Sequence, residues 1–237
     1  MHYIPILSTI VTFAFAAAVL ARWRYKKGPH LLLWGLGLVW YGLGTLSEVI
    51  LAFTFNPLVL KVWYLSGAML TAAWLGQGTV YLLVRKRAVA NFLMVCLGIA
   101  SLVSLLLLLL APITPAAAFY DPSLPASMQY KDILVRSGWI ILLTVLLNIY
   151  GTLALVGGAI YSAFLFWRKR VLVQRMLGNI LIAVGAMLPA MAGSFIRAGL
   201  PDFLYISEFL GVVIMYSGFI LATSTRPVER AVTAAAD

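Results

Sequence analysis

The sequence predicts an all-α integral membrane protein built as a seven-helix transmembrane bundle. Three observations lead to this fold class: an apolar composition, seven apolar runs of spanning length, and basic residues that gather between alternate runs. Of the 237 residues, 63% are hydrophobic and 10% are charged, whereas a soluble domain carries about a quarter charged residues. So much apolar surface cannot be buried inside one small globule, and lipid is its natural solvent.

A helix that crosses a membrane needs roughly 20 mostly apolar residues. Seven runs meet this requirement, at about 3–21, 31–55, 62–84, 89–110, 139–166, 176–198 and 203–223. The first run is not a secretory signal peptide, because its positive charges, from Arg22 to Lys27, follow the apolar stretch instead of preceding it. We therefore expect a single transmembrane domain over residues 1–237.

The positions of lysine and arginine predict the orientation of the bundle. One side carries 13 of them. These are Arg22, Arg24, Lys26, Lys27, Arg85, Lys86, Arg87, Arg168, Lys169, Arg170, Arg175, Arg226 and Arg230. The other side carries 4, namely Lys61, Lys131, Arg136 and Arg197. Because positive loops stay in the cytoplasm, we expect the N-terminus outside, the C-terminus inside, and a multi-pass location in the cell (cytoplasmic) membrane.

One loop, 111–138, is longer than the others and lies on the predicted outer side. It contains four prolines and several aromatic residues. Two interpretations remain open. The loop is either a lid over the outer mouth of the bundle or an interfacial segment whose aromatic rings sit at headgroup level, and the second is favoured.

The first three runs resemble the last three at three places, which predicts an internal repeat. Residues 23–24 match 167–168, residues 44–48 match 193–197, and residues 63–66 match 204–207. The copies would have the same orientation, with halves 1–87 and 133–226 and a linker helix at 88–110. This 3+1+3 plan resembles that of SWEET-type sugar transporters and of opsin-like proteins. No lysine in run seven is present for a retinal Schiff base, so a retinal-binding opsin is excluded on chemistry.

Several chemistries are poorly supported by the composition. Cys96 is the single cysteine, and the two histidines, His2 and His30, lie outside the apolar runs. We therefore expect no metal ion and no cofactor. The net charge of +10 comes from short clusters between apolar runs, so it indicates contact with lipid headgroups and not with nucleic acid. The sequence offers no catalytic residue set, and an enzymatic activity stays uncertain.

Four polar side chains fall at a similar predicted depth, in the outer third of the bilayer. They are Glu48, Asn148, Arg197 and Glu208, on four different runs. Ionisable residues at this depth cost about 2.5–3.5 kcal/mol each, so they are candidates for a functional site. The hypothesis is a polar ligand-binding cavity open to the outside. The alternative is structural, with one glutamate paired to Arg197 and the other hydrogen-bonded between helices.

Three further residues extend the predicted ligand-binding set. Tyr41 shares a helix face with Glu48 and with Trp34, because the three are spaced by seven. Trp74 and Gln77 lie deeper in run three. Run three carries a second aromatic stripe at similar spacing, with Tyr64, Trp74 and Tyr81. If the two stripes face each other they would line a pathway below the glutamate, although such stripes more often reflect packing.

The leading function from sequence is a small-solute carrier or solute-binding protein with a polar site in the outer half of the bundle. The first alternative is a receptor or sensor module, or a membrane subunit that acts through a partner protein. An intramembrane enzyme acting on lipid or quinone comes third. The expected partners are the lipid bilayer and a small-molecule ligand, with a protein partner or a second copy of the chain left open.

Overall fold

A computed structural model describes residues 3–169, 173–197 and 202–224. Within these residues, seven helices are long and apolar enough to cross a membrane. They cover Tyr3–Lys26, Pro29–Leu51, Pro57–Leu83, Arg87–Leu110, Gly138–Arg168, Val173–Met191 and Phe203–Thr223. The prediction of an all-α protein with seven helices of this kind is confirmed. We number these helices as spans one to seven.

Two of the spans contain a π-helical segment. The elements in chain order are α1 (Tyr3–Lys26), α2 (Pro29–Leu51), α3 (Pro57–Trp63), η1 (Tyr64–Leu70), α4 (Thr71–Leu83), α5 (Arg87–Leu110), η2 (Pro115–Phe119), α6 (Ala126–Ile133), α7 (Gly138–Thr152), η3 (Leu153–Gly157), α8 (Gly158–Lys169), α9 (Val173–Arg197) and α10 (Asp202–Thr223). Span three therefore consists of α3, η1 and α4, and span five of α7, η3 and α8. Both η1 and η3 are π-helical, whereas η2 is a short 3₁₀ turn.

Local capping explains where span three begins. The side chain of Asn56 accepts hydrogen bonds from the backbone N–H groups of Leu58 and Val59, at 2.9 and 3.2 Å. Pro57 occupies the first turn of the helix, where its missing N–H costs nothing. The helix thus starts before Lys61, and the apolar run alone predicted a start that was five residues too late.

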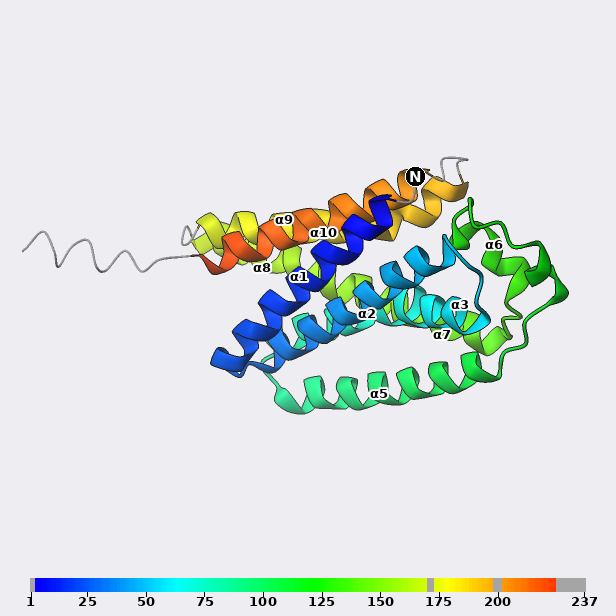
Figure 1. The fold of residues 1–237 in the computed structure, drawn as a ribbon. Coiled ribbons are helices and arrows are strands. Elements are labelled where there is room, and N and C mark those ends of the chain that lie inside the picture. The colour runs from blue at the N-terminus through cyan, green and yellow to red at the C-terminus, as the bar shows by residue number, and fades with distance from the viewer. Residues whose placement is uncertain (1–2, 170–172, 198–201, 225–237) are drawn as a thin grey trace, which may run out of the picture.

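The spans form a bundle with two distinct ends (Figure 1). We call the end that carries α6 the loop end. The opposite end, where the α1–α2 and α4–α5 connections lie, holds most of the basic residues and is the basic end. Helices α9 and α10 run together along one side of the bundle, α5 runs along the opposite side, and α1 packs against both α2 and α10.

Close approach of the spans depends on facing glycines. Four pairs meet across helix interfaces: Gly44 with Gly67, Gly76 with Gly151, Gly178 with Gly218, and Gly185 with Gly211. In lipid, where apolar surface gains little from leaving the solvent, such small residues let backbones pack closely. Other glycines of α2 also contact a neighbouring helix, because Gly35 and Gly42 face side chains of α1.

The loop between α5 and α7 packs against the loop end of the bundle. Ala126, Ile133 and Leu134 are buried in the same apolar cluster as Trp63 and Tyr64 of span three. Other side chains of the loop point outward, since Phe119 is 86% exposed. Tyr120 and Tyr130, by contrast, pack against the same apolar cluster. The lid and the interfacial segment both stay predictions.

Candidate functional site

A cavity of about 530 Å³ lies in the half of the bundle near the loop end. Its walls come from spans two, three, five, six and seven and from α6. Its polar lining residues are Tyr41, Thr45, Glu48, Trp63, Thr71, Ser127, Tyr130, Lys131, Asn148, Thr152 and Glu208. We call it the carboxyl cavity because it contains both glutamates. Its volume falls in the range of about 300–1,000 Å³ that is typical of small-molecule sites.

Glu48 lies in the wall of this cavity and is 5% exposed. One carboxyl oxygen, Oε1, accepts a hydrogen bond of 2.9 Å from the indole Nε1 of Trp63. The other oxygen, Oε2, is buried and accepts no hydrogen bond from an N–H or hydroxyl donor of the described residues. A buried acceptor that lacks a donor costs about 1–3 kcal/mol. An acceptor of this kind at the edge of a cavity is suited to a ligand that donates a hydrogen bond.

Glu208 of α10 also lines the cavity. Its carboxyl group and that of Glu48 interact electrostatically and through a side-chain hydrogen bond. The position of α10 is fixed here by a hydrogen bond of 3.0 Å from the Tyr41 hydroxyl to the backbone carbonyl oxygen of Glu208. Tyr41 thus joins spans two and seven at the depth of the carboxyl pair.

Asn148 lines the cavity, but its amide N–H groups also support the π-helical wall. Its Nδ2 donates to the backbone carbonyl oxygens of Ala68, at 2.7 Å, and Thr144, at 2.8 Å. The hydroxyl of Thr71 donates to the carbonyl oxygen of Ser66 at 2.8 Å. Both contacts reach carbonyls of η1, and in a bilayer any such group must be satisfied within the protein. The side chains therefore help to hold the irregular helix in place.

The rim of the carboxyl cavity at the loop end is formed by α6. Ser127, Tyr130 and Lys131 contribute to the lining, and Lys131 is exposed. The guanidinium of Arg136 lies 4.9 Å from the centre of the Tyr130 ring. Burial raises the pKa of Tyr130, with Arg136 opposing the shift, and burial raises the pKa of the nearby loop residue Tyr120 to about 12. Both phenols therefore stay neutral at physiological pH.

Four of the seven residues predicted as ligand-binding meet in this cavity. Glu48, Glu208, Asn148 and Tyr41 all line it. The side chain of a fifth, Arg197, lies outside the described part of the structure. The predicted pairing of Arg197 with a glutamate stays a prediction.

The two remaining predicted residues lie elsewhere. Trp74 donates from Nε1 to the hydroxyl of Ser101 on α5, at 3.2 Å. Gln77 is 0% exposed. Its Nε2 donates to the carbonyl oxygen of Ala90 at 2.9 Å, and its Oε1 accepts from the hydroxyl of Tyr150. Trp74 and Gln77 therefore connect helices α4, α5 and α7 and do not line the carboxyl cavity.

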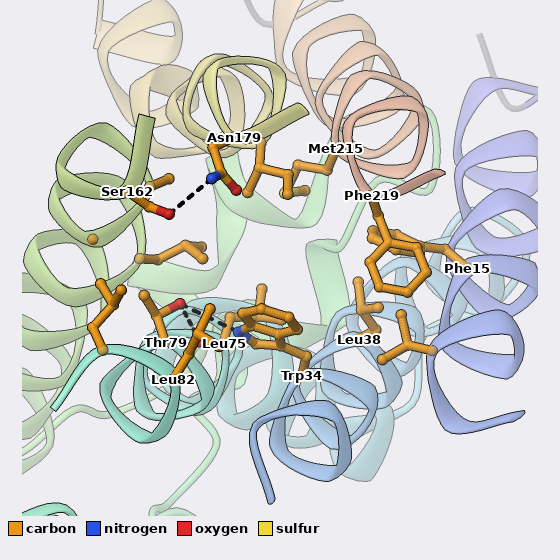
Figure 2. A pocket seen from close by; sticks show the side chains of 16 residues that line it. Phe15, Trp34, Leu38, Leu75, Thr79, Leu82, Ser162, Asn179, Met215 and Phe219 are labelled. Atoms are coloured by element: carbon orange, nitrogen blue, oxygen red, sulfur yellow. Dashed lines mark hydrogen bonds between the residues drawn. The ribbon is translucent and has the colours of Figure 1, made fainter. Parts of the chain in front are cut away.

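Figure 2 shows the side chains that line a second, smaller cavity, of about 60 Å³. Its lining includes Leu82 and Leu83, at the end of α4 that leads into the basic end. Asn179 donates to the hydroxyl of Ser162 at 2.8 Å on one side of it. On the other side, the indole of Trp34 donates to the hydroxyl of Thr79 at 3.2 Å. The sequence analysis did not predict this cavity. The signal was the common face of Trp34, Tyr41 and Glu48, because that face lines both cavities.

Three apolar side chains line both cavities and so lie between them. They are Leu75 of α4, Leu155 of η3 and Met215 of α10, and all three are buried. We call them the apolar floor. The floor separates the carboxyl pair from Thr79, Ser162 and Asn179. Sequence reasoning missed these three residues because leucine and methionine in a spanning helix carry no distinguishing signal.

Sequence reasoning also missed Trp63, which holds Glu48. Its signal was a tryptophan near the start of span three, at the same predicted depth as the glutamate.

No group of three or more histidine, cysteine, aspartate or glutamate side chains that could hold a metal ion occurs within the described ranges. Comparisons with protein-family models, with curated proteins and with solved structures give no match to this chain.

Proposed function

We propose that this multi-pass membrane protein is a small-solute carrier whose polar binding site is the carboxyl cavity. One observation supports the proposal most strongly. Two cavities lie next to each other along the bundle, and the apolar floor of Leu75, Leu155 and Met215 lines both of them. A carrier needs a site that can be reached from either side in turn, with a constriction that parts and reforms.

The backbone around the apolar floor supports movement of this kind. Leu155 lies within the π-helical segment η3, and Leu75 follows the π-helical segment η1 by five residues. Single π-helical turns inside helices are frequent at functional sites, because the extra residue in the turn changes the register of the helix. Pro189, which also lines the carboxyl cavity, removes one hydrogen bond from α9. Three of the walls thus contain a break in regular helical bonding.

The proposal includes an orientation and a repeat. The excess of lysine and arginine at the basic end supports an orientation with that end on the cytoplasmic side of the cell membrane. In this orientation the loop end, and with it the carboxyl cavity, faces the outside. The 3+1+3 plan is supported by the order of packing. The second helix of each triplet contacts both of its companions: α2 contacts α1 and α4, and α9 contacts α8 and α10.

The alternative is a receptor or sensor module that binds its ligand in the carboxyl cavity and acts through a partner. The buried apolar floor favours this reading, because it closes the cavity towards the basic end. A receptor keeps that floor closed while the ligand changes the packing of the helices. A carrier must open it.

Thiol accessibility distinguishes the two functions without knowledge of the solute. Thr152 lines the carboxyl cavity one turn from Leu155. In a Cys96→Ala background, Thr152→Cys is treated with a membrane-impermeant thiol reagent applied to one side of the membrane at a time. Carriage predicts modification from both sides, because the site is exposed to each in turn. Modification from the loop end alone would reject the carrier and leave the receptor.

The native cysteine supplies the control. Cys96 is exposed on α5, on a helix whose outward face is apolar and would contact lipid. In the otherwise unchanged chain it should react with the impermeant reagent from neither side. Reaction of Cys96 from both sides would show that the reagent crosses the membrane. The labelling of Thr152→Cys would then be repeated with a larger, charged maleimide.

A further inference from the structure

We infer that the ligand of the carboxyl cavity is a small organic cation, such as a protonated amine or a quaternary ammonium ion. This inference rests on the proposed function, in that it takes the carboxyl cavity as the solute site. It adds the chemical class of the solute, which follows from the charge, the free acceptor and the aromatic faces of the cavity.

Among the described residues, the carboxyl cavity is lined by two acidic side chains and one basic side chain. Glu48 and Glu208 are the acidic pair, and Lys131 is the one cationic side chain of this lining. Lys131 is exposed at the rim, where water and salt screen its charge. Two carboxyl groups in one enclosed site repel each other, and a shared proton relieves the repulsion. With one shared proton the pair would carry one net negative charge, which would attract a cation and repel an anion.

The free oxygen of Glu48 provides a specific contact for such a ligand. Oε1 is occupied by the Trp63 indole at 2.9 Å, so the carboxyl group is held in one orientation. Oε2 accepts no hydrogen bond from an N–H or hydroxyl donor of the described residues, although Glu48 is only 5% exposed. The polar group that interacts with this carboxyl is the Glu208 carboxyl, with which it can share a proton. An ammonium N–H would satisfy this oxygen with a charge-assisted hydrogen bond. An anion offers nothing to it.

Aromatic rings supply the second element of cation recognition. Trp63, Tyr41 and Tyr130 line the same cavity as the carboxyl pair. The faces of such rings carry negative electrostatic potential and attract alkylammonium groups, more so when water is excluded. The Tyr130 ring already has the Arg136 guanidinium 4.9 Å from its centre, so Trp63 and Tyr41 are the rings that we assign to the ligand. A cavity that combines carboxylates with aromatic walls therefore selects a positive group that also has apolar surface. Bare metal ions lack that surface, and the described residues offer no cluster of ligands for them.

The test uses two probes of the same shape and opposite charge. Benzyltrimethylammonium and benzylsulfonate share a benzyl group and differ in the sign of the attached ion. Binding to the purified full chain in lipid nanodiscs is measured by isothermal titration calorimetry, with thermal shift as a second readout. We expect the cation to bind and the anion to show no saturable binding. Equal binding of both probes, or preference for the sulfonate, would overturn the inference.

Matched variants locate the binding. Glu48→Gln keeps the shape of the side chain and should weaken binding of the cation by about tenfold or more, the effect of losing one charge-assisted contact. Asp132→Asn removes the same charge from an exposed position outside the cavity and should leave the affinity unchanged. An equal loss in both variants would show that overall charge, and not the cavity, attracts the probe. If Glu48→Gln does not fold, Glu208→Gln serves the same purpose.

The outcome of this experiment is independent of the test of the carrier proposal, because equilibrium binding does not require transport. Saturable binding of the cation, with Thr152→Cys modified from one side only, would retain the organic cation and reject the carrier. Modification from both sides, with no preference for the cation over the anion, would retain the carrier and reject the organic cation.

Discussion

Gly151 of span five lies so close to Ala72 of span three that a Cβ atom on Gly151 would come within 2.2 Å of the Ala72 carbonyl carbon. The neighbouring atom is backbone and cannot rotate away. Replacing Gly151 by alanine should therefore force the two spans apart, at a cost of about 1–3 kcal/mol or more for overpacking. Thermal unfolding of the purified variant in detergent measures the effect.

Gly98 provides the matched control for this change. A Cβ on Gly98 would meet no atom within 4 Å, so Gly98→Ala should leave the unfolding temperature unchanged or raise it slightly, because alanine favours helix more than glycine does. Destabilisation of equal size in both variants would contradict the assigned contact between spans three and five.

Gln77 should act as a structural link, not as part of the binding site. Replacing Gln77 by leucine leaves the Tyr150 hydroxyl and the Ala90 carbonyl without this partner, and we expect a loss of about 1–3 kcal/mol of stability. Adding Tyr150→Phe removes the orphaned hydroxyl, so the double variant should recover part of the loss. Chemical denaturation of the single and double variants measures both. If the Gln77→Leu variant keeps normal stability but loses ligand binding, Gln77 belongs to the binding site after all.

The Asp121 turn in the loop between α5 and α6 should weaken at low pH. Its Oδ1 accepts hydrogen bonds from the backbone N–H of Ser123, at 2.8 Å, and from the Ser123 hydroxyl, at 2.6 Å. These bonds hold the pKa of the Asp121 carboxyl below its usual range. Because the folded value is the lower one, the turn is stabilised above the ordinary aspartate pKa of about 3.9 and loses that stabilisation as pH falls through the lowered value.

An NMR titration of the Ser123 amide resonance follows this transition directly. The resonance should shift in the acid range in the native chain, and Asp121→Asn should abolish the step, because asparagine does not titrate. A Ser123 amide that is insensitive to acid in the native chain would mean that the Asp121 contact does not form in solution.

The predicted orientation can be tested with two engineered cysteines in the Cys96→Ala background. Ser123→Cys lies in the loop at the loop end, and Lys86→Cys lies in the connection at the basic end. In intact cells, an impermeant reagent should label Ser123→Cys, whereas Lys86→Cys should require lysed cells. Labelling of both cysteines in intact cells would contradict the seven-span arrangement, because α5 separates the two positions. The reverse pattern would show that the predicted orientation is the wrong way round.

Much of the fold follows from the sequence because lipid imposes strict conditions on the backbone. Seven runs of adequate length lead directly to seven helices. The convergence of Glu48 and Glu208 was predictable for a related reason. Carboxyl groups at membrane depth must turn towards protein or water, and these two share a depth. Depth alone does not define the direction of a side chain around its helix, so Gln77 was predicted in the site although it faces α5 and α7.

Other features depend on interactions that no local pattern encodes. The π-helical segments arise within apolar sequence, and their carbonyls are satisfied from another span, as Asn148 does for Ala68. The apolar floor is defined by where Leu75, Leu155 and Met215 meet, and each resembles many other apolar residues of the chain. The internal repeat stays a prediction.

The apolar floor also acts as electrical insulation. Leu75, Leu155 and Met215 offer no nitrogen or oxygen atom, and hydrophobic constrictions of this kind exclude water. Proton conduction along a water chain needs an unbroken row of hydrogen bonds, which the floor interrupts. Each elementary charge that crosses the membrane releases about 2.3 kcal/mol per 100 mV. With the floor closed, a proton on the carboxyl pair would therefore have no such path from the carboxyl cavity to the basic end.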